Sequence, residues 1–157
     1  PAQSGDMVDI ATGEIKGRHE GLMYYTLGQR QGLGIGGSGS GEPWFVADKD
    51  LSRNVLYVVQ GDKHHSLYST SLEASGVNWI NGIDLASGPV RCMAKFRYRQ
   101  PDQGVTLTAG VDGNVHVAFD VPQKAITPGQ AVVFYLDELC LGGGTIESAE
   151  KVVPMPQ

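Results

Sequence analysis

Four basic side chains recur in the short segment from Arg91 to Arg99, and these are the residues of the chain best suited to bind an anion. Successive side chains of a β-strand point to opposite faces. A strand over this segment puts its basic side chains on one face: Arg91, Lys95, Arg97 and Arg99. The other face consists of Cys92, Ala94, Phe96 and Tyr98. No carboxylate interrupts the segment, so we expect a bare positive face that binds phosphate.

A second interpretation of this segment is an exposed edge strand, because lysine and arginine on an edge discourage pairing with other chains. Three arginines and one tyrosine favour the first interpretation. The guanidinium fork matches the oxygens of a phosphate group, and an aromatic ring can stack on a base or a ribose. The pattern by itself leaves both interpretations open.

The overall composition limits how such a contact can be made. The chain has 157 residues, a net charge of −5 and 41% hydrophobic residues, which is typical of a folded globular protein. Because the chain is acidic, a nucleic-acid contact must be confined to one strand or groove. No apolar run is long enough to span a membrane. The chain begins at Pro1 rather than methionine, so we expect it to be a fragment of a longer protein.

The remaining candidates for chemistry are weaker. A formal G-x-G-x-x-G match begins at Gly32, but it does not follow a strand or open a helix, as a dinucleotide site requires. His64 and His65 lack further metal ligands and are expected in a solvated loop. Cys140 could be a reactive thiolate, although a buried strand cysteine is commoner and nothing nearby would lower its pKa. With Cys92 as the only other cysteine, we expect a reducing, cytoplasmic setting, no metal site and no catalytic residue in this chain.

The elements that must position the basic segment are predicted to be mainly β. In the first part of the chain we expect one short helix around residues 22–26 that stops at Gly28, and then a glycine-rich loop over 28–41 that is mobile unless bound. Strands are expected over 44–48 and 54–60. The polar stretch from Ser66 to Ser71 marks a boundary, so we assign residues 1–68 to a central β-rich domain and 69–157 to a C-terminal domain.

The C-terminal domain is predicted to be a β-barrel. Its expected strands are short and separated by turns about every ten residues, which indicates a small barrel or sandwich. They cover residues 91–99, 104–109, 114–119, 131–135 and 139–146. Asp112-Gly113 predicts a hairpin and Pro128-Gly129 a tight turn.

Four motifs resemble those of one enzyme family, the tRNA-specific 2-thiouridylases. Gly21-Leu-Met-Tyr-Tyr-Thr-Leu-Gly-Gln-Arg30-Gln-Gly-Leu-Gly-Ile-Gly-Gly is similar to the signature of that family's central domain. The C-terminal signatures are matched by Lys95-Phe-Arg-Tyr-Arg-Gln100, Thr127-Pro-Gly-Gln-Ala-Val-Val-Phe-Tyr135 and Cys140-Leu-Gly-Gly-Gly-Thr-Ile146. The motifs occur in the family's order and cover nearly the whole chain.

The resemblance implies an enzyme that replaces the 2-oxygen of the wobble uridine of certain tRNAs by sulfur. ATP and Mg²⁺ would be used by an N-terminal domain that this chain lacks, together with a persulfide sulfur from a donor protein. The resemblance also implies that the C-terminal barrel is similar to an elongation-factor barrel. Cys92 and Cys140 lie in the C-terminal signatures and do not inherit the role of the family's catalytic cysteines.

Carried over residue by residue, the resemblance makes Arg97, Tyr98 and Gln130 tRNA-contacting residues. Lys95 and Arg99 join them from the basic face, and Gln29 and Arg30 are candidates for an interdomain or RNA contact. Strict alternation puts Tyr98 opposite Arg97, so both can touch RNA only near the end of the strand.

We therefore expect a tRNA-positioning fragment of a sulfurtransferase that is inactive alone, with no DNA or membrane partner. An alternative is a module that docks a sulfur-donor protein or a partner domain. The net negative charge of the chain favours this alternative. Catalysis by Cys140 unaided is a third possibility.

Overall fold

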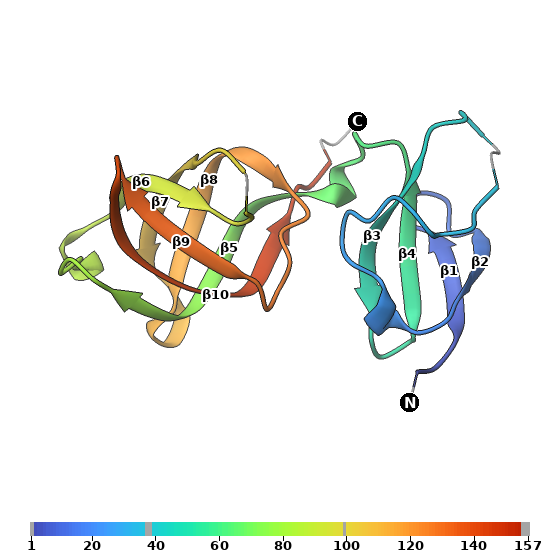
Figure 1. Cartoon of the computed structure of the whole chain (residues 1–157), viewed down its shortest axis with the longest axis horizontal. Coiled ribbons are helices and arrows are strands. Elements are labelled where there is room, and N and C mark those ends of the chain that lie inside the picture. The colour runs from blue at the N-terminus through green and yellow to red at the C-terminus, as the bar shows by residue number, and fades with distance from the viewer. Residues whose placement is uncertain (1, 37–38, 99, 155–157) are drawn as a thin grey trace. The chain divides into compact units, whose positions relative to one another are not determined.

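The structure is a computed structural model that describes residues 2–36, 39–98 and 100–154, and it is mainly β (Figure 1). The chain forms two compact units. The first ends at Tyr68 and also takes in Val153 and Pro154, and the second spans Ser69–Val152. In the parts of the chain that the structure describes, no helix has the length and hydropathy needed to cross a bilayer.

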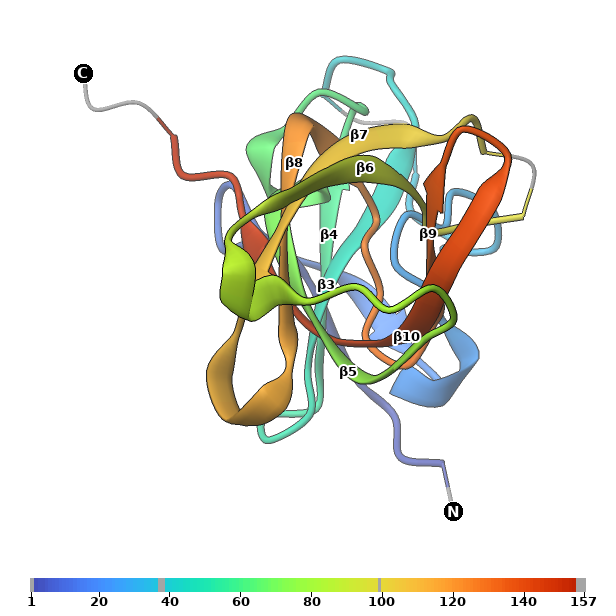
Figure 2. The ribbon, with the colours of Figure 1, turned by 90° about the vertical axis from the view of Figure 1, so that its left-hand side faces the viewer.

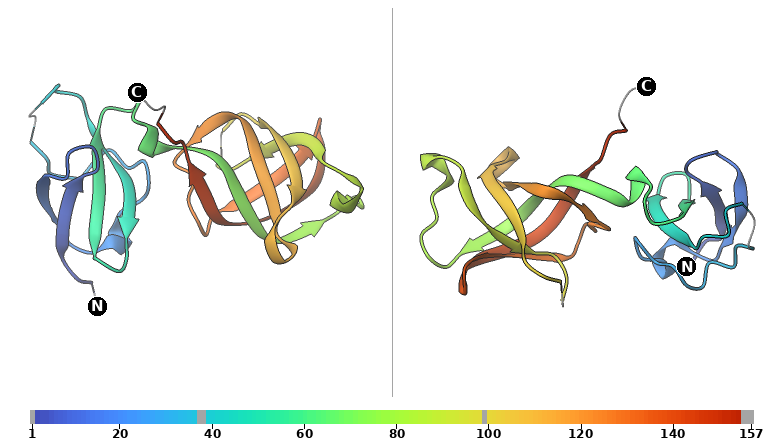
Figure 3. Two further views of the ribbon diagram at one scale, coloured as in Figure 1. Left: turned by 180° about the vertical axis from the view of Figure 1, so that it is seen from behind. Right: turned by 90° about the horizontal axis from the view of Figure 1, so that it is seen from above.

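The first unit is a four-stranded sheet in the order β2-β1-β4-β3 (Figure 3). Its strands are β1 (Gly5–Asp9), β2 (Ile15–His19), β3 (Trp44–Asp50) and β4 (Val55–Gln60). β1 and β4 are parallel, whereas the other neighbours are antiparallel. The prediction of β3 and β4 is confirmed. The sequence analysis missed β1 and β2, because β1 buries a glycine and an aspartate in place of two of the apolar residues that usually mark a strand.

Both faces of this sheet are covered. Met7, Leu56 and Val58 pack with Trp44 and Leu33 in one cluster. A second cluster consists of Phe45, Ala47, Val59 and Leu67. The expected short helix is a single 3₁₀ turn, η1 (Leu22–Tyr24), and it ends at Tyr25 rather than at Gly28. A further 3₁₀ turn, η2 (His65–Leu67), follows β4.

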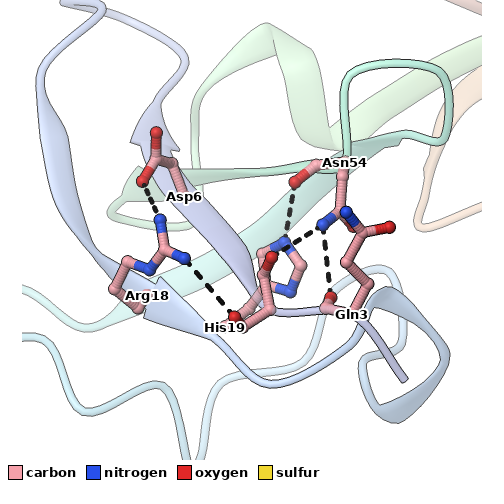
Figure 4. Close-up of polar contacts among 6 residues, drawn as sticks. Gln3, Asp6, Arg18, His19 and Asn54 are labelled. Carbon is pink, nitrogen blue, oxygen red and sulfur yellow. Dashed lines mark hydrogen bonds and ion pairs between the residues drawn. The ribbon is translucent and has the colours of Figure 1, made fainter. Parts of the chain in front are cut away.

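A buried histidine fixes the start of β1 beside the β3–β4 turn (Figure 4). His19 has 0% of its surface exposed, and its Nδ1 accepts the Gly21 N–H at 3.1 Å. Nε2 must therefore carry the ring hydrogen, which it donates to the Asn54 carbonyl oxygen at 2.8 Å. The Asn54 side chain donates in turn to the carbonyl oxygens of Gln3 and Ser4. The network satisfies the polar atoms of the imidazole in the interior.

The second unit is a closed barrel with the strand order β10-β5-β8-β7-β6-β9, and Figure 2 shows these strands as a ring. Its six strands are β5 (Tyr68–Trp79), β6 (Val90–Lys95), β7 (Gln103–Ala109), β8 (Val115–Lys124), β9 (Ala131–Leu136) and β10 (Leu139–Lys151). Two 3₁₀ turns complete the unit, η3 (Leu85–Ser87) and η4 (Val111–Gly113). The prediction of a mainly β chain with a barrel in its second half is confirmed.

The barrel interior is filled by the apolar residues that alternate along each strand. Phe134, Leu107, Val117 and Ile146 are almost completely buried, and the Phe134 ring stacks on Trp79 at 5.7 Å between centroids. β7 and β8 form the hairpin expected from Asp112-Gly113, and both turn residues have positive φ. The sequence analysis missed β5, because its first half buries Ser69 and Ser71 as well as Leu72, and serine is not a typical sign of a buried strand.

Candidate nucleic-acid interface

The basic segment is not one continuous strand. β6 ends at Lys95, and Arg97 and Tyr98 lie in the turn that leads to β7. The expectation of a strand from Arg91 to Arg99 is therefore wrong in its second half. A turn frees the two side chains from strict alternation, and both are exposed, Tyr98 over 89% of its surface. Arg99 lies outside the described residues.

The turn is anchored by the residue that precedes it. Phe96 is buried, and its ring packs against Phe119 of β8 at 5.1 Å between centroids. The Phe96 N–H donates to the side-chain oxygen of Gln100 at 3.3 Å. Arg97 and Tyr98 thus project from a segment whose two ends are fixed to the barrel.

Arg97 is a cation of this segment that remains available to bind an anion. Among the described residues no carboxylate forms an ion pair with it. Desolvation by neighbouring atoms lowers the pKa of Arg97, but a guanidinium stays charged at neutral pH. An exposed charge without a carboxylate partner is suited to bind a phosphate oxygen.

The other end of the basic segment is neutralised, which corrects the expectation of a bare positive face. Arg91 makes two contacts with the carboxylate of Asp120 in β8, at 2.6 and 2.8 Å, and donates to Thr106 Oγ1 at 3.0 Å. The Arg91 hydrogen bond lowers the pKa of Asp120. The sequence gives no sign of this partner, because Asp120 is reached across β7.

The charge of Lys95 is partly neutralised, less than that of Arg91 and more than that of Arg97. Its Nζ is 3.6 Å from Asp102 Oδ1, which is an ion pair beyond hydrogen-bonding distance, and 5.9 Å from the centre of the Tyr135 ring. The side chain remains partly exposed. Lys95 can therefore add positive charge beside Arg97, although Asp102 offsets part of it.

Gln130 is brought to the same end of the barrel. β6 and β9 run antiparallel, with Lys95 opposite Val133, so the end of β6 lies beside the start of β9 at Ala131. Gln130 directly precedes that start. Its carbonyl oxygen accepts the Ile146 N–H at 2.8 Å, while its side chain is exposed. Lys95, Arg97, Tyr98 and Gln130 are thus gathered from two segments more than thirty residues apart in the sequence.

Gln29 and Arg30 belong to the first unit, and they differ in how their side chains are held. The Gln29 side chain accepts the Thr26 N–H and donates to the Gln31 carbonyl oxygen, both at 2.9 Å, so it holds its own loop. The Gln29 backbone is also bonded to Val46 of β3. Arg30 is exposed and lines an open cavity of about 420 Å³ with the loop from Gln31 to Gly36.

The glycine-rich loop is attached to the sheet over its first part. Leu33 is buried in the core of the first unit, and Leu27 and Ile35 pack against the same cluster. This packing corrects the expectation that the loop is held only when bound, for the part up to Gly36. Gly37 and Ser38 lie outside the described residues.

His64 and His65 have a structural role rather than the solvated one expected. Both are half-buried, with ring centroids 4.2 Å apart. Nδ1 of His64 accepts the Ser66 N–H at 3.1 Å and so caps η2. Desolvation lowers the pKa of His64, which favours the neutral ring.

Comparison with known proteins decides the family. The aminomethyltransferase beta-barrel domain model matches residues 69–146, and the tRNA methyl transferase PRC-barrel domain model matches residues 1–60. The chain is 58% identical over 151 residues to the tRNA-specific 2-thiouridylase MnmA of Alkaliphilus oremlandii, 61% to that of Halalkalibacterium halodurans and 54% to that of Bacillus subtilis. This chain belongs to the tRNA-specific 2-thiouridylase family.

These alignments cover 96% of this chain but only 40 or 41% of each of the three thiouridylases. The chain thus spans about two fifths of the length of the relatives that it matches. The two family models meet in the sequence between residues 60 and 69, next to the point where the first compact unit ends.

The two cysteines of this thiouridylase-family chain differ in their surroundings. Cys92 is buried, and desolvation raises its pKa to about 11, while the charge of Arg91 acts in the opposite direction. Cys140 is half-buried in β10. A pKa of about 11 leaves about one thiolate in a thousand at pH 8.

We expect Cys92 to resist thiol reagents such as 5,5′-dithiobis(2-nitrobenzoate) at pH 8 until the barrel unfolds. In a Cys140→Ser variant only Cys92 can react with the reagent, and in a Cys92→Ser variant only Cys140 can react. Because folding raises the Cys92 pKa from the usual 9.0 to about 11, its contribution to stability is complete below pH 9 and lost between pH 9 and 11. Rapid labelling of Cys92 in the folded protein at pH 8 would contradict this assignment.

Proposed function

We propose that this chain is the tRNA-positioning part of a tRNA-specific 2-thiouridylase. The observation that supports it best is the exposed turn of Arg97 and Tyr98, which lies beside Lys95 and next to the Gln130 turn at one end of the barrel. Contacts to phosphate fix orientation and register without reading bases. The barrel would hold the body of the tRNA while another part of the enzyme modifies the wobble uridine.

The whole enzyme, on this proposal, is cytoplasmic and transfers sulfur to the 2-position of that uridine. ATP, Mg²⁺ and a persulfide sulfur from a donor protein would act in an N-terminal domain. The role of this chain is binding and orientation, and we expect no turnover from it alone.

The test is a binding titration of unmodified tRNA over a series of salt concentrations, with Arg97→Ala as the variant. Losing a charged hydrogen bond to phosphate is expected to weaken binding about tenfold. The slope of log affinity against log salt should also fall by somewhat less than one unit, because about one counterion fewer is released.

Arg91→Ala is the matched control, since it removes the same charge from the same segment but from a side chain already bonded to Asp120. We expect it to leave tRNA affinity nearly unchanged. Equal losses for the two variants would mean that overall charge, and not the Arg97 turn, determines binding. An unchanged affinity for folded Arg97→Ala would reject the proposal.

A second candidate function is docking of a sulfur-donor protein. The observation that favours it is the β9–β10 hairpin, where Leu136 and Leu139 are 51% and 52% exposed on either side of Asp137 and Glu138. An acidic turn flanked by leucines suits a basic protein partner. Retention of a donor protein without tRNA affinity would support this function instead of the first.

A further inference from the structure

Three glutamine side chains connect the Arg97 turn to the barrel through a chain of hydrogen bonds. Gln100 and Gln103 stand on either side of Pro101, and Gln123 lies near the end of β8. Gln123 is only 6% exposed, which is unusual for a glutamine. A polar side chain buried this deeply needs hydrogen-bond partners for its amide.

Both polar atoms of the Gln123 side-chain amide form hydrogen bonds. Its Oε1 accepts from Gln100 Nε2 at 3.1 Å. Its Nε2 donates to Gln103 Oε1 at 3.1 Å and to the Val121 carbonyl oxygen at 2.8 Å. One buried amide therefore holds both of the glutamines that frame the turn.

The bonds continue from these glutamines into the turn backbone. Gln100 Oε1 accepts the Phe96 N–H at 3.3 Å, directly before Arg97. Gln103 Nε2 donates to the Pro101 carbonyl oxygen at 2.9 Å. The direction of donation is the same throughout, from Phe96 to Gln100, from Gln100 to Gln123, from Gln123 to Gln103 and from Gln103 to Pro101.

We propose that Gln123 is a positioning residue for tRNA binding, which sets the conformation of the turn that presents Arg97 and Tyr98. This inference rests on the proposed function. Gln123 itself is too deeply buried to contact RNA, so it acts through Gln100 and Gln103. It deepens the proposed function by assigning a role to a residue outside all four family motifs.

The test combines Gln123→Leu with Arg97→Ala in a double-mutant cycle for tRNA affinity. Leucine keeps much of the shape but removes all three hydrogen bonds of the side chain. Gln123→Leu should weaken binding about five- to tenfold, and Arg97→Ala in that background should then cost less than about threefold instead of tenfold. A buried residue with a purely structural role, far from binding, would leave the Arg97→Ala effect unchanged.

Gln123→Glu provides a finer comparison. It keeps an acceptor for Gln100, but an ionised carboxylate cannot donate to Gln103 or Val121. Gln100→Leu and Gln103→Leu each break one side of the network at less buried positions, so they serve if Gln123→Leu does not fold. Hydrogen exchange at the Phe96 N–H gives a readout without RNA, and Gln100→Leu should accelerate it.

The outcomes separate this inference from the proposed function. If the single substitution Arg97→Ala, with Gln123 in place, does not weaken tRNA binding, the proposed function fails. If Arg97→Ala does weaken binding but folded Gln123→Leu binds normally, or its effect adds fully to that of Arg97→Ala, the positioning role of Gln123 is overturned. Weakened binding with a clear loss of additivity supports both.

Discussion

Replacing Phe134 with alanine is expected to lower the free energy of unfolding of the barrel by about 3–5 kcal/mol. Phe134 is completely buried, and its ring stacks on Trp79. In the strand register it lies opposite Ala94 of β6 and Gly142 of β10. These small neighbours cannot move into the space that the ring leaves, because their backbones are fixed in the closed sheet, so most of the cavity should persist.

Urea unfolding followed by tryptophan fluorescence measures this loss. Trp79 lies in the barrel and Trp44 in the first unit, so a Trp44→Phe background leaves Trp79 as the only tryptophan of the chain. Val111→Ala, at an exposed position of η4, is the control and should change stability by less than about 0.5 kcal/mol. A loss below about 1 kcal/mol for Phe134→Ala would mean that the core adapts to the cavity.

Gly142→Ala is expected to destabilise the same barrel by about 3 kcal/mol or more, through a different mechanism. Gly142 begins the glycine triplet of β10 and has φ of 149°, which an L-residue with a side chain rarely adopts. A Cβ atom there would overlap the carbonyl oxygen of Asn78 in β5. The backbone strain and the collision should add, since neither strand can withdraw without breaking their pairing.

Gly76→Ala separates these two contributions. Gly76 of β5 also has positive φ, 58°, but an added Cβ would meet nothing within 4 Å. We expect it to cost only the backbone strain, about 1–2 kcal/mol. The same urea titration compares the two variants. If Gly142→Ala cost no more than Gly76→Ala, close strand packing would not explain the triplet.

The sequence by itself determined which residues face the barrel interior in its most regular strands. Val105 and Leu107, Val132 and Phe134 alternate with polar or smaller residues, and this period of two holds wherever one face is buried. The motifs around Arg97 and Gln130 also indicated the family, which the comparisons bear out. Strands that bury glycine or serine, such as β1 and β5, gave no such signal.

Only the tertiary structure decided which charges are available. Alternation assigns a side chain to a face but not to a partner, and the partners come from strands remote in the sequence. Arg91 and Arg97 are equivalent in the sequence pattern, yet strand pairing brings Asp120 to Arg91, while β6 ends before Arg97. Gln123 is likewise an ordinary glutamine in the sequence, and closure of the barrel buries it beneath the Arg97 turn. Long-range pairing therefore separates Arg91, which is bonded to another strand of the barrel, from Arg97, which remains available to bind.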